Sequence, residues 1–497
     1  MISRRTALAA LAATGIPARA QRKPNFLFLI ADDHAGYVLG AHGNRQALTP
    51  NLDRLAAEGT RFARHFCNSP VCTPSRQSLL TSQLPHSAGV TVLRTPLSED
   101  QPTLAKQLKS AGYHTAVFGK MHFNRPSQPG LHGFQTLMLE GDIQKAWGGQ
   151  PATPVPEGVK TKPLPWRPFR DPARIWLNAD KLPYPRRYEE MRGTFTARRA
   201  IDFLDQHGRD PFALWVSFPE PHSPFDFPIE DRDRFPAHSF STPRVGPEDA
   251  WQVPLIFRDL SEDDKRGIIA AYYTSVHFLD RNLGMVLDKL RAMGLEENTL
   301  VVYLADHGYS LGHHGRFEKH CGYDPAMHVP LIVRWPGHVR RGHTVNDMTE
   351  HIDVPPTILD LLGAEPFAVN HGQSLRPYLE GRRPAARREH VFSEYLENEE
   401  AFVRTDRWKL ICCTGRRERT DGYKTDRPTP GPYVRLYDLK RDSGEFTDVA
   451  GAHPDVVRQM QDRMIERFRA THPEAQAEPG GLGTREAIEW YLRPRDA

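Results

Sequence analysis

The chain has little cysteine and no excess of charge of either sign. Only five cysteines occur among 497 residues, at irregular spacing: Cys67, Cys72, Cys321, Cys412 and Cys413. An odd, irregular set is neither a disulfide framework nor a CxxC zinc site. The 65 basic and 61 acidic residues nearly cancel, so bulk charge gives no reason to expect nucleic-acid binding. At 39% hydrophobic residues, the chain is rich enough in apolar side chains for a sizeable core.

Long hydrophobic runs are also missing, so we expect no membrane span. Residues 1–20 begin with a basic stretch that includes Arg4 and Arg5, continue with a short Ala/Leu segment and end on Ala18-Arg19-Ala20. This order is typical of an export signal that is later removed. The paired arginines favour the twin-arginine route, with ordinary secretion as the alternative. We therefore expect a periplasmic or secreted protein.

Short apolar runs alternate with helical patterns through most of the chain. This alternation is typical of an α/β fold, with a large mixed, mostly parallel sheet sandwiched by helices. Four expected strands end on charged or imidazole side chains, namely Asp32 and Asp33, Lys120 and His122, His222, and Asp306 and His307. Because ligands bind beyond the carboxyl ends of parallel strands, we expect these residues to converge.

Two regions depart from this alternation. Residues 147–192 are rich in proline and arginine with weak periodicity, which predicts a long loop insertion that shapes a substrate pocket. From residue 371 the chain has short strand-like runs and an amphipathic helical segment, which predicts a small C-terminal antiparallel sheet with a helix. We therefore divide the chain into a signal segment (1–20), a catalytic domain (21–370) and a small α+β subdomain (371–497).

The acidic pairs are candidate metal ligands. Asp32-Asp33 and Asp306-His307 offer mainly oxygen ligands and one nitrogen. Carboxylates suit Ca²⁺ or Mg²⁺, and a histidine admits Mn²⁺ or Zn²⁺. Each pair by itself is also what a polar turn after a strand looks like. Two such pairs after two strands favour a metal site.

Cys72 precedes Thr-Pro-Ser-Arg in the segment SPVCTPSRQSLLTS. It is a structural thiol, a thiolate nucleophile or the precursor of a modified residue. The segment lacks the glycines with which a cysteine phosphatase loop points backbone amides at phosphate, and Arg76 follows too soon. A papain-like site needs only a histidine partner and leaves the acidic pairs unexplained. An unmodified thiolate is therefore disfavoured.

Several short motifs of the sequence resemble those of one enzyme family. CTPSRQSLLTS is similar to the signature of type I sulfatases, formylglycine-dependent enzymes of the alkaline phosphatase superfamily. The segments PNFLFLIADDH, GYHTAVFGKMH, PEPHSPF and LADHGYSLGHHGRFEKH resemble other motifs of that family, in the same order along nearly the whole mature chain. His307, where many relatives carry asparagine, and the run HGRFEKH are closest to iduronate-2-sulfatase-like members.

The resemblance implies a chemistry and roles for single residues. A maturation enzyme would oxidise Cys72 to formylglycine, whose hydrated form has one hydroxyl to attack sulfur and a second to expel sulfate. One divalent cation, Ca²⁺ ahead of Mg²⁺ or Mn²⁺, would be bound by residue 72 and the two acidic pairs. The other catalytic positions implied are Arg76, which stabilises the diol, Lys120 and Lys319, which supply positive charge, His122, a base for sulfate expulsion, and His222, an acid for the leaving oxygen.

The function expected from this resemblance is hydrolysis of a sulfated sugar or oligosaccharide. A phosphonate monoester hydrolase or phosphodiesterase with the same nucleophile is the alternative enzyme class. A non-catalytic glycan-binding relative is disfavoured, because a binding protein needs neither the cysteine motif nor the metal set. Ser82, Met121 and Phe123 differ from the usual family residues, and we expect them to affect substrate fit more than catalysis.

Overall fold

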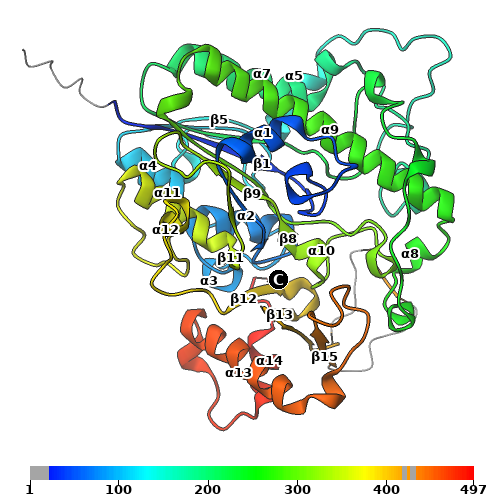
Figure 1. The fold of residues 1–497 in the computed structure, drawn as a ribbon, viewed down its shortest axis with the longest axis vertical. Helices are drawn as coiled ribbons and strands as arrows, with labels where there is room; N and C mark the ends of the chain where they lie inside the picture. The colour runs from blue at the N-terminus through cyan, green and yellow to red at the C-terminus, as the bar shows by residue number, and fades with distance from the viewer. Residues whose placement is uncertain (1–21, 417–421, 426–432, 497) are drawn as a thin grey trace, which may run out of the picture.

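The computed structural model describes residues 22–416, 422–425 and 433–496, so the predicted signal segment lies outside the described residues. The described chain forms three sheets (Figure 1). The strands are β1 (Asn25–Ala31), β2 (Thr60–Phe62), β3 (His65–Phe66), β4 (His114–Gly119), β5 (Thr136–Leu139), β6 (Phe212–Ser217), β7 (Thr299–Ala305), β8 (His328–Val329), β9 (Leu331–Arg334), β10 (His343–Val345), β11 (Thr349–Glu350), β12 (His390–Tyr395), β13 (Glu400–Thr405), β14 (Trp408–Cys413) and β15 (Tyr433–Asp438).

The largest sheet has eight strands in the order β10-β2-β9-β7-β1-β6-β4-β5. Only β9 runs antiparallel to its neighbours, β2 and β7. The strands β7, β1, β6 and β4 stand side by side and in parallel at its centre. The predicted α/β fold with a mostly parallel sheet is therefore confirmed.

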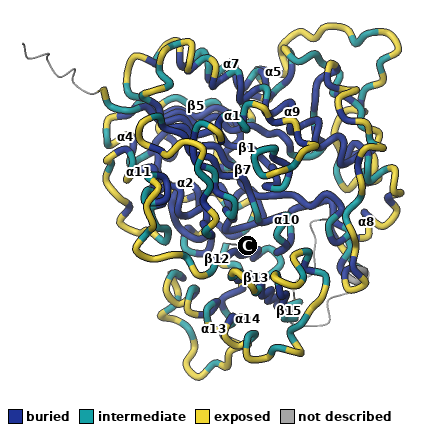
Figure 2. Tube along the Cα trace, in the orientation of Figure 1, coloured by how far each residue is buried: buried dark blue, intermediate teal, exposed yellow. Residues whose placement is uncertain are grey.

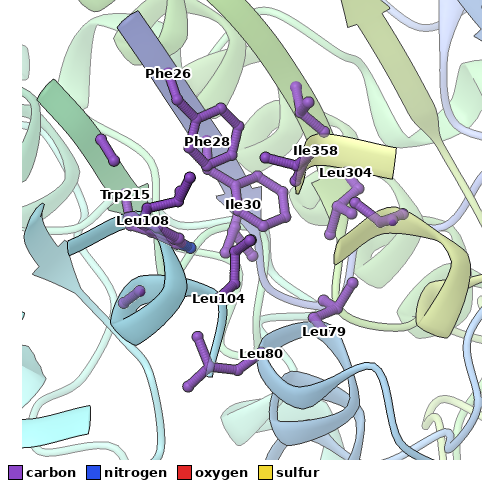
Figure 3. Packing of buried hydrophobic residues seen from close by; sticks show 14 of the residues in the cluster. Phe26, Phe28, Ile30, Leu79, Leu80, Leu104, Leu108, Trp215, Leu304 and Ile358 are labelled. Carbon is purple, nitrogen blue, oxygen red and sulfur yellow. The ribbon is translucent and has the colours of Figure 1, made fainter. Parts of the chain in front are cut away.

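Strand β1 shows why the sheet is buried on both faces. Its sequence NFLFLIA is apolar almost throughout, as parallel strands covered on both sides require. Phe26, Phe28 and Ile30 enter one core cluster, and Leu27 and Leu29 enter the cluster on the opposite face. Figure 2 shows the central strands buried, and Figure 3 shows the first cluster, in which Phe26 and Trp215 pack edge to face.

Helices cover the two faces. Residues of α1, α7 and α9 contribute to one core cluster, and residues of α2, α4 and α11 to the other. No helix among the described residues is long and apolar enough to cross a membrane. The helices are α1 (Pro50–Glu58), α2 (Cys72–Thr81), α3 (Pro85–Ala88), α4 (Leu104–Ser110), α5 (Glu140–Gly148), α6 (Ala173–Trp176), α7 (Arg192–His207), α8 (Leu255–Arg258), α9 (Glu262–Ala292), α10 (Asp324–Met327), α11 (Val354–Leu362), α12 (Arg376–Leu379), α13 (Pro454–Thr471) and α14 (Thr484–Tyr491).

The C-terminal part forms a four-stranded antiparallel sheet, β12-β13-β14-β15, that packs against α13 and α14. The predicted small sheet and its helix are confirmed, whereas α14 was not expected. The boundary at residue 370 stays a prediction. All five cysteines are buried and none forms a disulfide.

A buried ion cluster ties this sheet to the main body. Lys409 on β14 is 0% exposed, and its Nζ lies 2.8 Å from Oδ1 of Asp324 and 2.7 Å from Oε1 of Glu445. Arg404 on β13 also contacts Asp324, at 3.0 Å. Since Asp324 begins α10 in the main body, these ion pairs connect segments far apart in the sequence.

We expect Lys409→Met to lower the free energy of unfolding by about 3–5 kcal/mol, because it leaves the buried Glu445 carboxylate without its lysine and Asp324 with Arg404 alone. Urea unfolding measures the change. Lys440→Met is the matched control, since Lys440 is exposed on the loop after β15, and it should change stability by no more than about 0.5 kcal/mol. Equal stability of the two variants would show that the cluster contributes nothing.

Candidate active site

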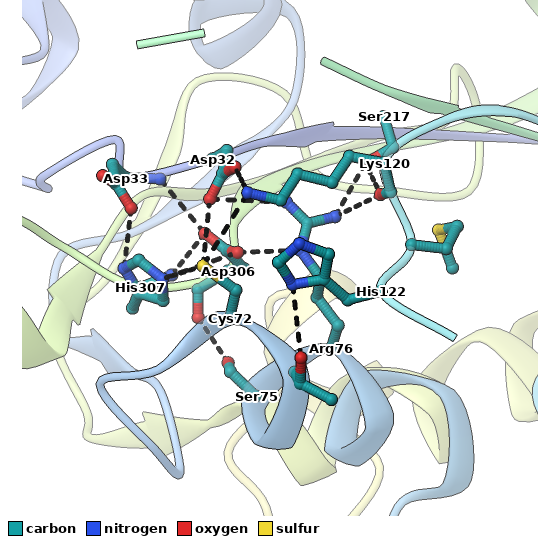
Figure 4. A network of polar contacts seen from close by, with 12 residues as sticks. Asp32, Asp33, Cys72, Ser75, Arg76, Lys120, His122, Ser217, Asp306 and His307 are labelled. Atoms are coloured by element: carbon teal, nitrogen blue, oxygen red, sulfur yellow. Dashed lines mark hydrogen bonds and ion pairs between the residues drawn. The ribbon is translucent and has the colours of Figure 1, made fainter. Parts of the chain in front are cut away.

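The predicted convergence of polar residues occurs at one edge of the main sheet. Strands β7, β1, β6 and β4 are parallel neighbours, so their carboxyl ends meet there. Asp32 and Asp33 follow β1, Lys120 follows β4, and Asp306 and His307 follow β7. Figure 4 shows these side chains around Cys72, which comes from below on α2.

Cys72 is the first residue of α2 and is 2% exposed. Its Sγ lies 3.1 Å from Nε2 of His307 and 3.4 Å from Oδ1 of Asp32. Burial, with the Asp32 carboxylate beside it, raises the pKa of the Cys72 thiol far above its ordinary value. The thiol therefore stays protonated near neutral pH and is a poor nucleophile as it stands.

Arg76 lies one turn further along the same helix, so its guanidinium reaches the same strand ends. Its Nε donates to Oδ2 of Asp306 at 2.8 Å, and its Nη1 donates to Oγ of Ser217 at 2.8 Å. Burial opposes the charge, but Asp306 and Asp32 outweigh it and raise the pKa of Arg76. The guanidinium is therefore buried, and its ion pair holds the Asp306 carboxylate in place near Cys72.

Two lysines flank the sulfur. Nζ of Lys319 lies 3.4 Å from Sγ of Cys72 and donates to Oδ1 of Asp33 at 2.8 Å. Nζ of Lys120 lies 3.9 Å from the same sulfur and forms an ion pair with Asp32. Burial by itself would raise the pKa of Asp32, but Lys120 and the other cations hold it well below its ordinary value.

One group of side chains fits a metal ion. Ligand atoms of Asp32, Cys72, Asp306 and His307 all lie within 4.8 Å of one another, and all four residues are buried. Nδ1 of His307 lies 3.0 Å from the carbonyl of Gly308, which can only accept, so Nε2 keeps its lone pair and faces the group. Asp33 adds a buried Oδ2 that no donor among the described residues satisfies. A cation here would satisfy these oxygens.

Two histidines lie at the edge of this group. A ring nitrogen of His222 is within 4.8 Å of ligand atoms of Asp33 and Cys72. Its Nδ1 donates to the carbonyl of Ser223 at 2.7 Å, and burial lowers its pKa to about 4. His122 instead lies 3.2 Å from Oγ1 of Thr73, and burial, together with Lys120, lowers its pKa well below the ordinary value.

Three contacts to Asp306 and Arg76 were missed from the sequence. The Asp306 carbonyl accepts from Oγ of Ser75 and, at 2.9 Å, from Nε2 of His351. Nδ1 of His351 then accepts from Nε2 of His65, also at 2.9 Å. Ser217, at the end of β6, contacts Arg76 as described above. The position of Ser217 at a strand end was a signal for it, whereas nothing in the sequence pairs His65 with His351.

A cavity of about 850 Å³ opens above the sulfur. The insertion at residues 147–192 supplies much of its wall, including Trp147, Leu164 and Trp166, as predicted. Met121 and Phe123 pack into the core below the sheet and are not among the residues that line the cavity. The expectation that these two residues affect substrate fit stays a prediction, and neither side chain would contact a substrate in the cavity directly.

Ser82 also departs from the family pattern for a structural reason. It caps α2 in the left-handed conformation (φ 59°), where glycine is the usual residue. Its Oγ lies 2.7 Å from the Ile352 carbonyl oxygen and 2.6 Å from Oδ1 of Asn370, and its single hydroxyl proton can be donated to one of these two acceptors. The hydrogen bond holds the helix end, and Ser82 does not line the cavity.

Known proteins resemble this chain along most of its length. A choline-sulfatase of Rhizobium meliloti is 27% identical, over 95% of this chain and 91% of the relative. An N-acetylglucosamine-6-O-sulfatase of Bacteroides thetaiotaomicron is 26% identical, over 86% and 83% respectively. Among solved structures, a phosphonate monoester hydrolase of Agrobacterium radiobacter superposes with a TM-score of 0.75 and 25% identity, over 91% of this chain and 97% of that one.

Family models match in the same regions. The C-terminal model of N-sulphoglucosamine sulphohydrolase covers residues 312–471. The sulfatase model covers residues 24–364, which span all the strand ends described above. Because that match takes in more than half of the chain, the protein belongs to the sulfatase family of hydrolases.

Proposed function

We propose that the protein releases sulfate from a sulfated carbohydrate, using a formylglycine made from Cys72 and one bound divalent cation. The observation that carries the proposal is the position of Cys72. It lies buried between Lys120 and Lys319 and beside Asp32 and His307. Two cations and a metal-type ligand set around one side chain suit the transfer of an anionic group.

The surroundings of Cys72 support its modification. An unmodified thiol at this position stays protonated, because burial raises its pKa. Once hydrated, formylglycine supplies a hydroxyl nucleophile and a second hydroxyl whose deprotonation releases the sulfate. The two lysine ammonium groups then face oxygens instead of sulfur, which gives them stronger hydrogen-bond acceptors.

Asp32, Asp33, Asp306 and His307, with residue 72, are the residues that would hold the cation. Three carboxylates and one imidazole favour a hard ion, and we propose Ca²⁺ ahead of Mg²⁺ or Mn²⁺. When bound there, a cation would supply Lewis-acid charge to the reaction. Arg76 holds Asp306 in place from behind through its 2.8 Å bond to Oδ2.

The remaining residues handle charge and protons. Lys120 and Lys319 stabilise negative charge on the nucleophile and on the sulfate oxygens. His222 lines the cavity and donates a proton to the departing alcohol. Since its pKa is lowered to about 4 by burial and by Lys319, His222 must be protonated together with the binding of the anionic substrate. His122 acts as the base for sulfate expulsion.

A carbohydrate substrate is supported by the relatives. One is named for N-acetylglucosamine 6-sulfate and another for a hexuronate 2-sulfate. A cavity of about 850 Å³ is large enough for a mono- or disaccharide. The kinship to iduronate-2-sulfatase-like members stays a prediction that rests on His307 and the HGRFEKH run.

A phosphonate monoester hydrolase is the second candidate, because such an enzyme shares the fold at a TM-score of 0.75. A phosphonate monoester carries one negative charge, as a sulfate monoester does, so the charges around Cys72 do not separate the two. Matured protein should be assayed on sulfated mono- and oligosaccharides, with phosphonate monoesters and phosphodiesters as controls. We expect kcat/KM to be highest for a sulfated sugar. A higher value for a phosphonate ester would favour the second candidate.

We further propose export by the signal in residues 1–20 to the periplasm or outside the cell. If the route is the twin-arginine pathway, the protein crosses the membrane folded. On that route, because Cys72 is buried in the folded chain, the maturation enzyme must act in the cytoplasm before folding is complete.

A further inference from the structure

The mouth of the cavity carries exposed apolar side chains. Leu164 is 50% exposed, Trp166 is 40% exposed and Phe169 is 44% exposed, and all three line the cavity that holds Cys72. Large apolar groups that stay exposed together usually mark a binding surface. Leu164, Trp166 and Phe169 together form a mouth platform.

The platform is held in position by its neighbours. Nε1 of Trp166 donates to the Trp176 carbonyl at 3.1 Å. The Trp166 and His222 rings form a T-shaped pair, with centroids 5.8 Å apart and planes at 84°. Phe169 packs on Trp176 and Tyr423, with centroid distances of 5.3 Å and 5.1 Å. The platform is therefore a fixed wall beside the residue proposed to protonate the leaving alcohol.

The charges around the platform are not those of a polyanion site. Beyond the residues around Cys72, the charged side chains that line the cavity among the described residues are Glu140, Lys162, Arg192, Asp226 and Glu397. Lys162 forms an ion pair with Asp226. This leaves Glu140 and Glu397 against Arg192, so the outer cavity offers no excess of positive charge to a second sulfate or a carboxylate.

We propose that the mouth platform binds the flat apolar face of the alcohol part of a singly sulfated substrate, with Trp166 as the main contact. This inference rests on the proposed function, which identifies the substrate as a sulfate ester. It adds the chemical class of the alcohol part of that ester. A pyranose ring has such a face, and stacking on tryptophan buries it without requiring further charge. The mouth platform adds no binding energy for the further anionic groups of a substrate that carries several of them.

Binding to a variant that cannot turn over tests the platform apart from catalysis. In a Cys72→Ala background, calorimetry measures Kd for a monosulfated N-acetylglucosamine, for its disulfated analogue and for inorganic sulfate. We expect Trp166→Ala to raise Kd for the monosulfated sugar by about tenfold and to leave Kd for inorganic sulfate unchanged, because sulfate alone does not reach the platform. Trp166→Phe should recover most of the affinity, and Leu255→Ala, an exposed apolar residue that does not line the cavity, should change neither value.

An unchanged Kd for the monosulfated sugar in Trp166→Ala would overturn the proposal, and so would a parallel loss of inorganic sulfate binding, which indicates a distorted inner site. If Trp166→Ala does not fold, Kd for the monosulfated sugar is compared between Trp166→Phe and Trp166→Leu. Equal values for these two variants would overturn the proposal in the same way. A disulfated sugar that binds tenfold tighter than the monosulfated one would refute the claim that the outer cavity offers no excess of positive charge to a second sulfate. Absence of turnover in the matured wild type would count against the proposed function, while these affinities still decide the platform.

Discussion

Asp306→Asn should remove the bound cation and lower kcat/KM by at least about a hundredfold, because Lewis-acid charge contributes several kcal/mol to such reactions. Asparagine keeps an oxygen for the backbone N–H groups of Asp33 and His307, which donate to Oδ1 at 3.1 Å and 2.9 Å. The loss then reports the missing carboxylate charge, together with the ion pair that Arg76 makes with Oδ2, and not a collapsed loop. Elemental analysis after dialysis measures the metal, and initial rates measure turnover.

The matched control is Asp360→Asn, whose side chain is 40% exposed and pairs with Arg376 away from the site. It should keep full metal content and activity. Removal of the metal by chelation should give the wild type the low activity of Asp306→Asn, and added Ca²⁺ should restore it. Full activity after exhaustive chelation would refute the metal part of the account.

His222→Ala should lose activity according to the leaving group. A sugar alkoxide needs a proton in the transition state, and general acid catalysis is typically worth about 10²–10⁴-fold. A nitrophenolate leaves without that proton. The variant should therefore lose about 10²–10⁴-fold on a sulfated sugar and far less on nitrophenyl sulfate.

Lys120→Ala is the comparison for His222→Ala. Because Lys120 acts at the nucleophile end, 3.9 Å from the sulfur of Cys72, its loss should affect both substrates alike. If His222→Ala also lost equal activity on both, this histidine would bind sulfate or shape the cavity, and the acid role would pass to Lys319.

The parts of the site that follow strands were predictable from the sequence. An apolar run that ends on Asp32-Asp33 or Asp306-His307 gives both the strand and the position of its polar residues. Parallel neighbours then bring these positions to one edge, whatever their separation in the chain. The start of helix α2 at Cys72 was not predicted.

Contacts between loops and distant elements were not predictable in the same way. His65 and His351 meet because β3 pairs with β11 in a separate sheet, and a two-residue strand leaves no periodicity to detect. Met121 and Phe123 flank a catalytic motif, yet their side chains turn into the core. Trp166 lies in a segment with weak periodicity, so only the fold of that segment shows that it reaches His222.

Mass spectrometry of the tryptic peptide from His65 to Arg76, taken from active protein, tests the central claim most directly. This peptide contains Cys67 and Cys72, so Cys67 serves as an internal control for a plain thiol. After treatment with a thiol-alkylating reagent, we expect one alkyl group, on Cys67, and an aldehyde or its hydrate at residue 72. Two alkylated cysteines in fully active protein would contradict the formylglycine mechanism.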